Sequence, residues 1–290
     1  MSQPPIDPRA IRLYDEYTHA PLPRRVFLER LAVIAGGATA AAALLPMLEN
    51  NYAHAGQVGE DDPRIKCKRE TIDGASGPLR GYLVRARKAG PVPAVLVIHE
   101  NRGLNAHIED VARRVGSAGF VAFAVDLLSS AGGTPTDEDR ARTMIGALDP
   151  ATALADARAA VAWLARVKGT TGKVGAVGFC WGGGMVNRLA VAEPNLAAGV
   201  VFYGMSPALD GVPAIKAALL LHYAGLDERI NATVPDYEAA LKAAGKRYEL
   251  YRYEGVEHAF HNDSNAARYN ADAAALAWDR TVAFLTKNLI

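Results

Sequence analysis

From Pro93 onward, short apolar runs alternate with longer segments in which apolar residues recur at helical spacing. Apolar runs of about four to eight residues are typical of buried strands, whereas a period of about 3.6 residues indicates a helix. This alternation predicts an α/β fold, with a mostly parallel central sheet and helices on both of its faces. The expected strands cover residues 94–98, 121–125, 174–178, 198–203, 217–223 and 247–253, and the expected helices cover 107–118, 136–148, 151–168, 181–192, 233–244 and 266–289.

Two further strands are expected before this region, at Ile65–Ile72 and Leu79–Arg87. The residues between them include Asp73-Gly74 and Gly77-Pro78, which are turn formers, so the pair predicts an N-terminal β-hairpin. The chain has 290 residues, of which 50% are hydrophobic. This is enough for one large α/β domain, which we assign to residues 56–290.

Residues 1–55 have a different character. Arg24 and Arg25 precede an alanine-rich apolar run at Leu31–Leu45, which is too short for an ordinary membrane span, and Ala53-His54-Ala55 is a small-x-small sequence. Together these features resemble a twin-arginine export signal. We therefore expect residues 1–55 to lie outside the fold, and a mature periplasmic protein without stable membrane association to begin near Gly56. The alternative is a buried or surface-anchoring N-terminal helix, with a cytoplasmic location.

Composition narrows the possible functions. The chain carries 32 Lys and Arg residues and 31 Asp and Glu residues, a net charge of +1, so its overall charge does not favour nucleic acid. The two cysteines, Cys67 and Cys180, have neither metal-site spacing nor a CxxC motif. We expect no metal and no organic cofactor, and we interpret Cys67, on the first hairpin strand, as a packing residue. A monomer and a homodimer are both compatible with the sequence.

The strongest chemical signal is the sequence Gly178-Phe179-Cys180-Trp181-Gly182, between an apolar strand and a predicted helix. This is the Gly-x-nucleophile-x-Gly pattern of a nucleophile elbow, with cysteine as the nucleophile. A tight strand-to-helix turn strains the backbone, and Gly178 and Gly182 leave room where a Cβ would clash. The N-terminus of the following helix favours a thiolate at Cys180.

Parallel sheets place their functional sites at the C-terminal ends of their strands. Asp227 and His258 follow two later strands, so the chain order is nucleophile, acid, histidine, as in α/β-hydrolases. His258 would exchange protons with the nucleophile, the leaving group and water, while Asp227 would orient the imidazole. The backbone N–H groups of Trp181 and of Asn101 are the expected oxyanion hole.

Other residues compete for these roles. Glu228 is the alternative to Asp227, which in turn could be a simple helix cap. His222 lies inside an apolar strand and is expected to be packed and hydrogen-bonded, and His261 is expected to be exposed. Glu100 follows the strand at residues 94–98 and could pair with Arg102 as an ordinary loop ion pair.

Roughly residues 60–290 resemble the dienelactone hydrolase (carboxymethylenebutenolidase) family. The resemblance is carried by the elbow sequence, by Asp227, by Gly255…His258-Ala259-Phe260 and by His99-Glu100-Asn101-Arg102-Gly103-Leu104-Asn105. The family implies an α/β-hydrolase fold and a Cys-Asp-His triad that hydrolyses cyclic enol-lactone esters. It also implies that Glu100 contacts Cys180 in the resting enzyme, and that substrate binding frees the thiolate by disturbing that contact.

The chain departs from the family where substrate is selected. Members that cleave dienelactones hold the substrate carboxylate with two arginines, one after the Asp-Leu pair that follows a core strand and one shortly after the histidine. Here Ser129 and Ser130 follow Asp126-Leu127-Leu128, and His261 and Asn262 follow Phe260. Neither position has a guanidinium, so a strong bidentate contact is missing. Arg102 and Arg229 are candidates to replace it.

These observations predict a cysteine-dependent hydrolase of a small ester or lactone that acts through a thioester intermediate. The alternative from another class is a ligand-binding or thiol-sensing protein on the same scaffold, in which Cys180 is reversibly oxidised without turnover. A cysteine peptidase is disfavoured, because the local signatures of that class are absent from the sequence. The natural substrate does not follow from the sequence.

Overall fold

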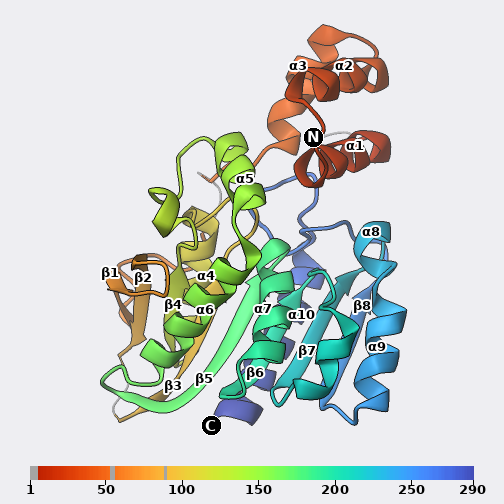
Figure 1. Cartoon of the computed structure of the whole chain (residues 1–290). Helices are drawn as coiled ribbons and strands as arrows, with labels where there is room; N and C mark the ends of the chain where they lie inside the picture. Colours follow the sequence, from red (N-terminus) through yellow and green to blue (C-terminus); the bar gives the residue numbers. More distant parts are fainter. Residues whose placement is uncertain (1–5, 53–55, 88–89) are drawn as a thin grey trace.

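The computed structural model describes residues 6–52, 56–87 and 90–290. Its centre is an eight-stranded sheet in the order β1-β2-β4-β3-β5-β6-β7-β8 (Figure 1). The strands are β1 (Ile65–Asp73), β2 (Pro78–Ala86), β3 (Val92–Ile98), β4 (Val121–Val125), β5 (Thr170–Phe179), β6 (Leu196–Phe202), β7 (Ala218–Ala224) and β8 (Tyr248–Tyr253). β1 and β2 form the predicted antiparallel hairpin, and β2 also pairs antiparallel with β4. From β4 to β8 all pairings are parallel, which confirms the predicted mostly parallel sheet.

Helices cover both faces of the sheet, as predicted. One apolar core joins the sheet to α6 (Pro150–Leu164), α7 (Trp181–Ala192) and α9 (Val234–Ala243). A second core, on the opposite face, joins it to α4 (Ala106–Ser117) and α10 (Ala271–Leu289). The seven residues of β3 are all buried, as expected for a central strand covered on both sides.

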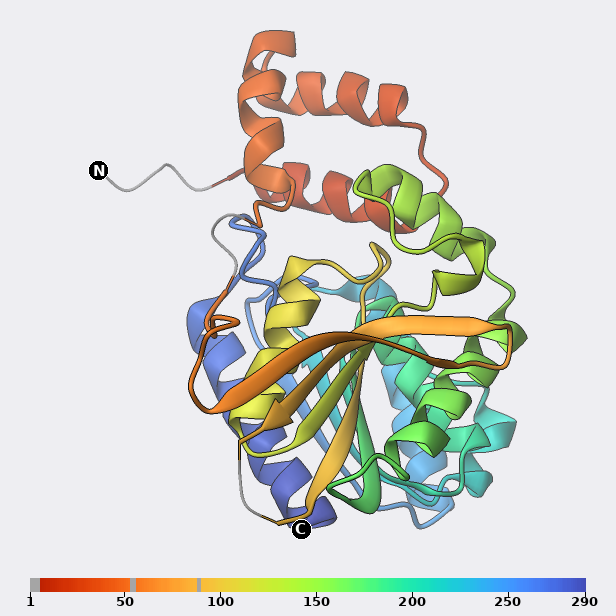
Figure 2. The same cartoon turned by 90° about the vertical axis from the view of Figure 1, so that its left-hand side faces the viewer.

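The main difference from the sequence prediction is at the N-terminus, because residues 6–52 fold against the α/β domain. They form α1 (Pro8–His19), α2 (Arg24–Ala35) and α3 (Ala38–Leu48), which lie beside α5 (Glu138–Ala147) at one end of the sheet (Figures 1 and 2). The expectation that this region stands outside the fold is therefore corrected. Residues 53–55, which contain the predicted cleavage site, lie outside the described residues. The export signal itself stays a prediction.

The three helices share an apolar cluster of their own. Tyr14, Tyr17, Phe27 and Leu31 are fully buried in it, and Tyr17 stacks on Phe27 with 4.4 Å between ring centroids. The break at Gly36 and Gly37, both with positive φ, lets α3 turn back on α2. Among the described residues no single helix meets the length and hydropathy criteria for a membrane span; α2 and α3 meet them only together, across a bend of 109°.

A truncation in the centre of the sheet tests the core. Leu96 on β3 is fully buried, so Leu96→Ala should lower the free energy of unfolding by about 2–5 kcal/mol through lost apolar burial and a residual cavity. Leu276→Ala on α10 is the matched control, because that side chain is 46% exposed and should change the value by no more than about 0.5 kcal/mol. Urea unfolding followed by circular dichroism measures both. Equal effects of the two substitutions would contradict the assignment of β3 to the core.

Candidate active site

Cys180 occupies the predicted elbow between β5 and α7. Its φ of 53° and ψ of −115° are unusual for a residue with a side chain, and its N–H donates to the carbonyl of Phe202 at 3.0 Å. A Cβ on Gly178 would overlap the carbonyl oxygen of Gly182, and one on Gly182 would overlap the carbonyl oxygens that end β3. The elbow sequence therefore needs glycine at both positions. Cys180 also precedes the first turn of α7, whose free N–H groups favour a negative charge.

The structure brings His258 and Asp227 together beneath the elbow. Asp227 follows β7, and its Oδ1 accepts the N–H of Ile230 at 3.2 Å, so it also caps α8 (Glu228–Asn231). His258 lies in the loop between β8 and α10, and its Nδ1 is 2.5 Å from Asp227 Oδ2. Both side chains are nearly fully buried, and His258 Nε2 has no hydrogen-bond partner within the described residues. The competitor Glu228 is exposed, so Asp227 is the carboxylate that orients His258.

A second histidine, which sequence reasoning missed, contacts the elbow cysteine. His19 is the last residue of α1, and its Nε2 lies 3.2 Å from Cys180 Sγ. Its Nδ1 is 2.9 Å from the backbone carbonyl of Asp15 and 3.1 Å from the Asp15 carboxylate. The spacing of Asp15 and His19, one helical turn apart, was a usable signal. It lies in a region whose twin arginines and apolar run resemble an export signal.

Cys180, His19 and His258 form one compact cluster, in which the sulfur and one nitrogen of each ring all lie within 4.8 Å of one another. The two imidazole rings meet edge to face, with 4.7 Å between their centroids. Two histidines and a cysteine are ligands that zinc accepts, so within the described residues this cluster is the candidate for holding a metal ion. The same groups also suit a thiolate stabilised by imidazolium.

The charges of the cluster support one another. Burial by itself raises the pKa of the Cys180 thiol, but the positive charges of His19 and His258 outweigh it and lower the pKa from 9.0 to about 6. Burial opposes a charge on His258, but Asp227, Cys180 and Asp15 raise its pKa well above the ordinary value. Burial likewise opposes a charge on His19, and Cys180 with Asp15 raises its pKa. The thiolate and the two imidazolium rings therefore stabilise one another, which favours the charged form of each group.

Glu100 is placed differently from the expectation. Its carboxylate accepts the Asn262 amide at 2.7 Å and the Tyr203 hydroxyl at 3.3 Å, and among the described residues we find no hydrogen bond between Glu100 and Cys180. The contact inferred from the family resemblance is corrected: the resting partner of the sulfur is His19. The physical reason is that Tyr203 and Asn262 already occupy both oxygens of Glu100, while α1 delivers an imidazole to the thiol.

The remaining alternatives are also resolved. Arg102 contacts Glu138 and donates to the Tyr14 hydroxyl at 2.9 Å, so it is not an ion-pair partner of Glu100. His222 is buried and hydrogen-bonded to Tyr253 and Thr281, as expected. His261 is fully buried among aromatic rings, so the expectation of exposure was wrong. Both cysteines are free, and Cys67 is partly buried on β1.

A cavity of about 670 Å³ opens above the cluster, between the N-terminal segment and the α/β domain. Asn101 and Trp181, the two residues of the predicted oxyanion hole, line it beside Cys180. Three arginines face it, namely Arg142, Arg188 and Arg229, and no carboxylate does among the described residues. Arg229, one of the two arginines suggested from the sequence, therefore reaches the cavity, whereas Arg102 does not line it.

The state of the sulfur can be measured by alkylation. In a Cys67→Ser background, the rate of Cys180 alkylation by iodoacetamide should be constant above about pH 7 and fall about tenfold per pH unit below about 6, because the thiolate is protonated there. Mass spectrometry of the labelled protein gives the rate at each pH. A midpoint near the ordinary thiol value of 9.0 would contradict the thiolate–imidazolium arrangement.

Comparisons with known proteins identify the family of the chain. The pattern of the Dienelactone hydrolase family matches residues 79–289. The chain is 33% identical over 222 residues to a "Putative carboxymethylenebutenolidase" from Methylorubrum extorquens, covering 70% of this chain and 75% of that protein. It is 50% identical over 113 residues to a "Putative hydrolase fragment YghX" from Escherichia coli, covering 38% and 97%.

A solved structure has a similar architecture. The crystal structure of a "Putative Dienelactone Hydrolase" from Klebsiella pneumoniae superposes with a TM-score of 0.70 at 29% identity, covering 77% of this chain and 99% of the other. The fold is thus that of the α/β-hydrolases, and the relatives indicate a hydrolase that acts on an ester or lactone. The chain belongs to the dienelactone hydrolase family.

Proposed function

We propose that the chain hydrolyses a small ester or lactone with Cys180 as the nucleophile, through a thioester intermediate. The observation that carries the proposal is the line of contacts from the Asp227 carboxylate through His258 to the elbow, with Cys180 at the base of the cavity. A thiolate is a strong nucleophile, and the thioester that it forms can be hydrolysed in a second step. No second class of function is favoured by a specific contact.

In the first step, Cys180 forms the thioester with the help of two backbone N–H groups and His258. The Cys180 thiolate attacks the acyl carbon, and the carbonyl oxygen becomes negatively charged as the tetrahedral intermediate forms. The N–H groups of Trp181, in the first turn of α7, and of Asn101, after β3, would donate to that oxygen. When the intermediate collapses, protonated His258 gives its Nε2 proton to the leaving alkoxide. Asp227 keeps the ring oriented and stabilises its charge.

The second step reverses the proton transfer. His258, now neutral, takes a proton from water, and the resulting hydroxide attacks the thioester. The thiolate is expelled, the carboxylic acid leaves and His258 is protonated again. The low pKa of the Cys180 thiol favours both steps, because the thiolate is available for attack at neutral pH and is a good leaving group afterwards.

Variants of the cluster test this mechanism. Cys180→Ala should abolish hydrolysis of a short-chain nitrophenyl ester, and His258→Ala should lower kcat by about 10²- to 10⁴-fold, because proton transfer to the leaving group is lost. Intact-mass spectrometry of the wild type after rapid acid quench should show one acyl group on Cys180, whereas Cys67→Ala should leave both activity and adduct unchanged. Full activity of Cys180→Ala would refute the nucleophile assignment.

The cavity charge suggests the substrate class. Arg188 and Arg229 are exposed at the cavity, and no carboxylate lines it among the described residues, so its potential favours a substrate that carries an anionic group near the scissile ester. Arg142 is the third arginine there, but it already contacts the Tyr17 carbonyl and Asp139. At the two positions where the family usually has carboxylate-binding arginines, this chain has serine at one and histidine or asparagine at the other. Arg188 and Arg229 would bind the substrate carboxylate in their place.

This assignment predicts a selective change in KM. Arg188→Gln and Arg229→Gln should each raise KM for a carboxylate-bearing ester or lactone by about tenfold. This equals the loss of one charge-assisted contact of about 1.4 kcal/mol. KM for a neutral nitrophenyl ester should stay unchanged. Arg247→Gln is the control, because Arg247 is exposed but lies just before β8, away from the cavity. Parallel changes with both substrates would argue against a carboxylate-binding role.

A further inference from the structure

The nucleophile lies between two histidine–aspartate pairs. One is His258 with Asp227, which the α/β domain supplies. The other is His19 with Asp15, which α1 supplies, and its Nε2 is the ring nitrogen that lies 3.2 Å from Cys180 Sγ. The family match begins at Leu79, so the second pair comes from a part of the chain outside the matched region.

The contacts of His19 define its proton states. Its Nδ1 faces the backbone carbonyl of Asp15 at 2.9 Å, and a carbonyl oxygen only accepts, so Nδ1 carries a hydrogen. In the neutral ring, Nε2 then has a lone pair directed at the thiol. After taking the thiol proton, the ring becomes an imidazolium whose Nε2–H donates to the thiolate. The nearby Asp15 carboxylate, at 3.1 Å, stabilises that positive charge.

We propose that His19 is a catalytic residue that holds Cys180 as a thiolate, and that the N-terminal segment of residues 6–52 completes the active site. The proposal rests on the proposed function, in which Cys180 is the nucleophile. It assigns a site role to a segment whose composition otherwise resembles a leader sequence.

The proton balance gives the two histidines different tasks. The thiol proton moves once from Sγ to His19 Nε2 and stays there, while His258 starts protonated. During acylation the thiolate forms the bond to the acyl carbon, and His258 loses its proton to the leaving alkoxide. During deacylation His258 recovers a proton from water, hydroxide forms the new C–O bond and the C–S bond breaks. His19 remains an imidazolium throughout and stabilises the thiolate both as attacking and as leaving group.

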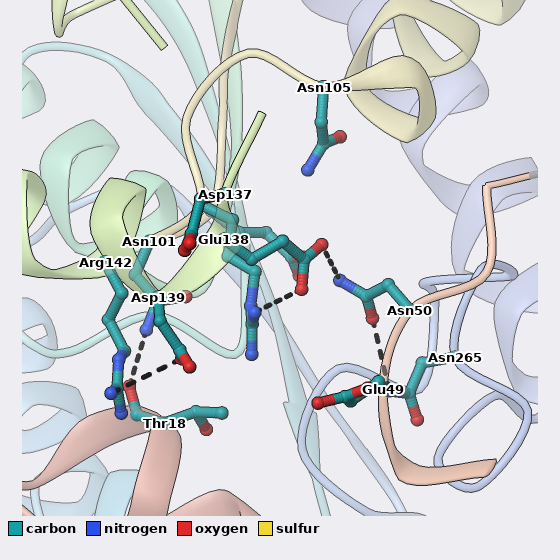
Figure 3. Close-up of polar contacts among 12 residues, drawn as sticks. Thr18, Glu49, Asn50, Asn101, Asn105, Asp137, Glu138, Asp139, Arg142 and Asn265 are labelled. Carbon is teal, nitrogen blue, oxygen red and sulfur yellow. Dashed lines mark hydrogen bonds and ion pairs between the residues drawn. The ribbon is translucent and has the colours of Figure 1, made fainter. Parts of the chain in front are cut away.

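Hydrogen bonds anchor the segment at Thr18 and at Asn50 (Figure 3). Asn101 donates its side-chain amide to the Thr18 carbonyl at 2.8 Å, directly before His19. At the other end of the segment, Asn50 donates to Glu138 at 3.0 Å and accepts from Asn265 at 3.2 Å. The Tyr17 hydroxyl also donates to Asp139 at 2.6 Å. These contacts connect the segment to α5 and to the loops that contain Asn101 and Asn265. Together they hold His19 in position.

The segment also forms part of the cavity wall. Residues 18–22 line the cavity opposite Trp181, Tyr203 and Met205 of the α/β domain. Removal of the segment would therefore expose the buried Cys180 sulfur to water and take away one of the two cations that lower its pKa. Other titratable or charged side chains also line the cavities beside His19. Among the described residues they are Arg12, Asp15 and Glu16 of α1 and Glu100, Arg102, Arg142, Arg188, Asp227, Glu228, Arg229, Glu257, His258 and Arg268 of the α/β domain.

This inference conflicts with cleavage near Gly56. A twin-arginine route carries folded proteins, so export with the segment retained is consistent with the proposal. Cleavage after Ala55 would remove His19 and Asp15 from the enzyme. The intact mass of active enzyme purified from a bacterial host should therefore include residues 6–52. Full specific activity in protein that begins near Gly56 would overturn the proposal.

The direct test compares His19→Gln with the wild type, both full length and in a Cys67→Ser background. His19→Gln should lower kcat on a neutral nitrophenyl ester by about 10²-fold with KM nearly unchanged, because thiolate stabilisation is lost and ester binding is not. It should also move the pH midpoint of Cys180 alkylation upward by about one unit or more. Asp15→Asn should shift both quantities in the same direction by less, and free imidazole should partly restore the activity of His19→Ala.

Arg30→Gln is the control for mere loosening of the segment, because it removes the exposed contact of α2 with Glu16 of α1 at 3.2 Å and leaves the contacts around His19 in place. It should leave the alkylation midpoint unchanged. A wild-type midpoint and kcat in His19→Gln, alongside an inactive Cys180→Ala, would overturn the role of His19 and leave the proposed function standing. An active Cys180→Ala would instead overturn the proposed function. If His19→Gln does not fold, unchanged alkylation and kcat in Asp15→Asn would overturn the proposal by themselves.

Discussion

The strained backbone of Cys180 is the constraint on which the site depends. A residue with φ of 53° and ψ of −115° is held there only because β5 ends in a hydrogen bond to β6 and α7 begins immediately afterwards. The turn raises the sulfur above the sheet edge at which β3, β7 and β8 also end. Glycine is needed on both sides, since a Cβ at Gly178 or Gly182 would overlap backbone oxygens. The parallel sheet therefore positions the nucleophile and its partners by the same geometry.

Burial of that sulfur creates an electrostatic problem. A thiolate that is 7% exposed costs free energy unless positive groups surround it, and burial by itself raises the pKa of Cys180. Two imidazole rings, each held by its own aspartate, lie close enough to the sulfur to supply that charge. Because Asp227 and Asp15 belong to different elements, the two rings reach the sulfur from distant parts of the chain.

The N-terminal helices are attached to the α/β domain mainly by polar contacts. Their apolar residues pack mainly against one another, and their contacts with the α/β domain are largely polar, from Asn101, Glu138, Asp139 and Asn265. Buried apolar area alone does not explain why α1 lies over the elbow. The hydrogen bonds give α1 its direction, and they place His19 against Cys180, while residues 18–22 line the cavity. One segment therefore forms part of the cavity wall and contacts the elbow cysteine.

Much of the α/β domain could be predicted from the pattern of residues. The strand at Val121–Val125 and the hairpin of β1 and β2 lie where the sequence placed them, because an apolar run between turn residues has few other stable arrangements in a protein of this size. The elbow and the positions of Asp227 and His258 followed from local sequence and strand order. β5 begins at Thr170, before the predicted start, because its first residues are exposed and carry little apolar signal.

What the sequence determined by itself was thus the fold, the elbow at Cys180 and the strand ends that carry Asp227 and His258, since these depend on local periodicity and on glycine. Tertiary structure alone decided that His19 contacts Cys180 across 161 positions of the chain, and that Glu100 is bound by Asn262 instead. Such contacts arise when distant segments dock through polar groups. A hydrogen bond between side chains far apart in sequence leaves no periodic trace, so only the folded chain reveals it.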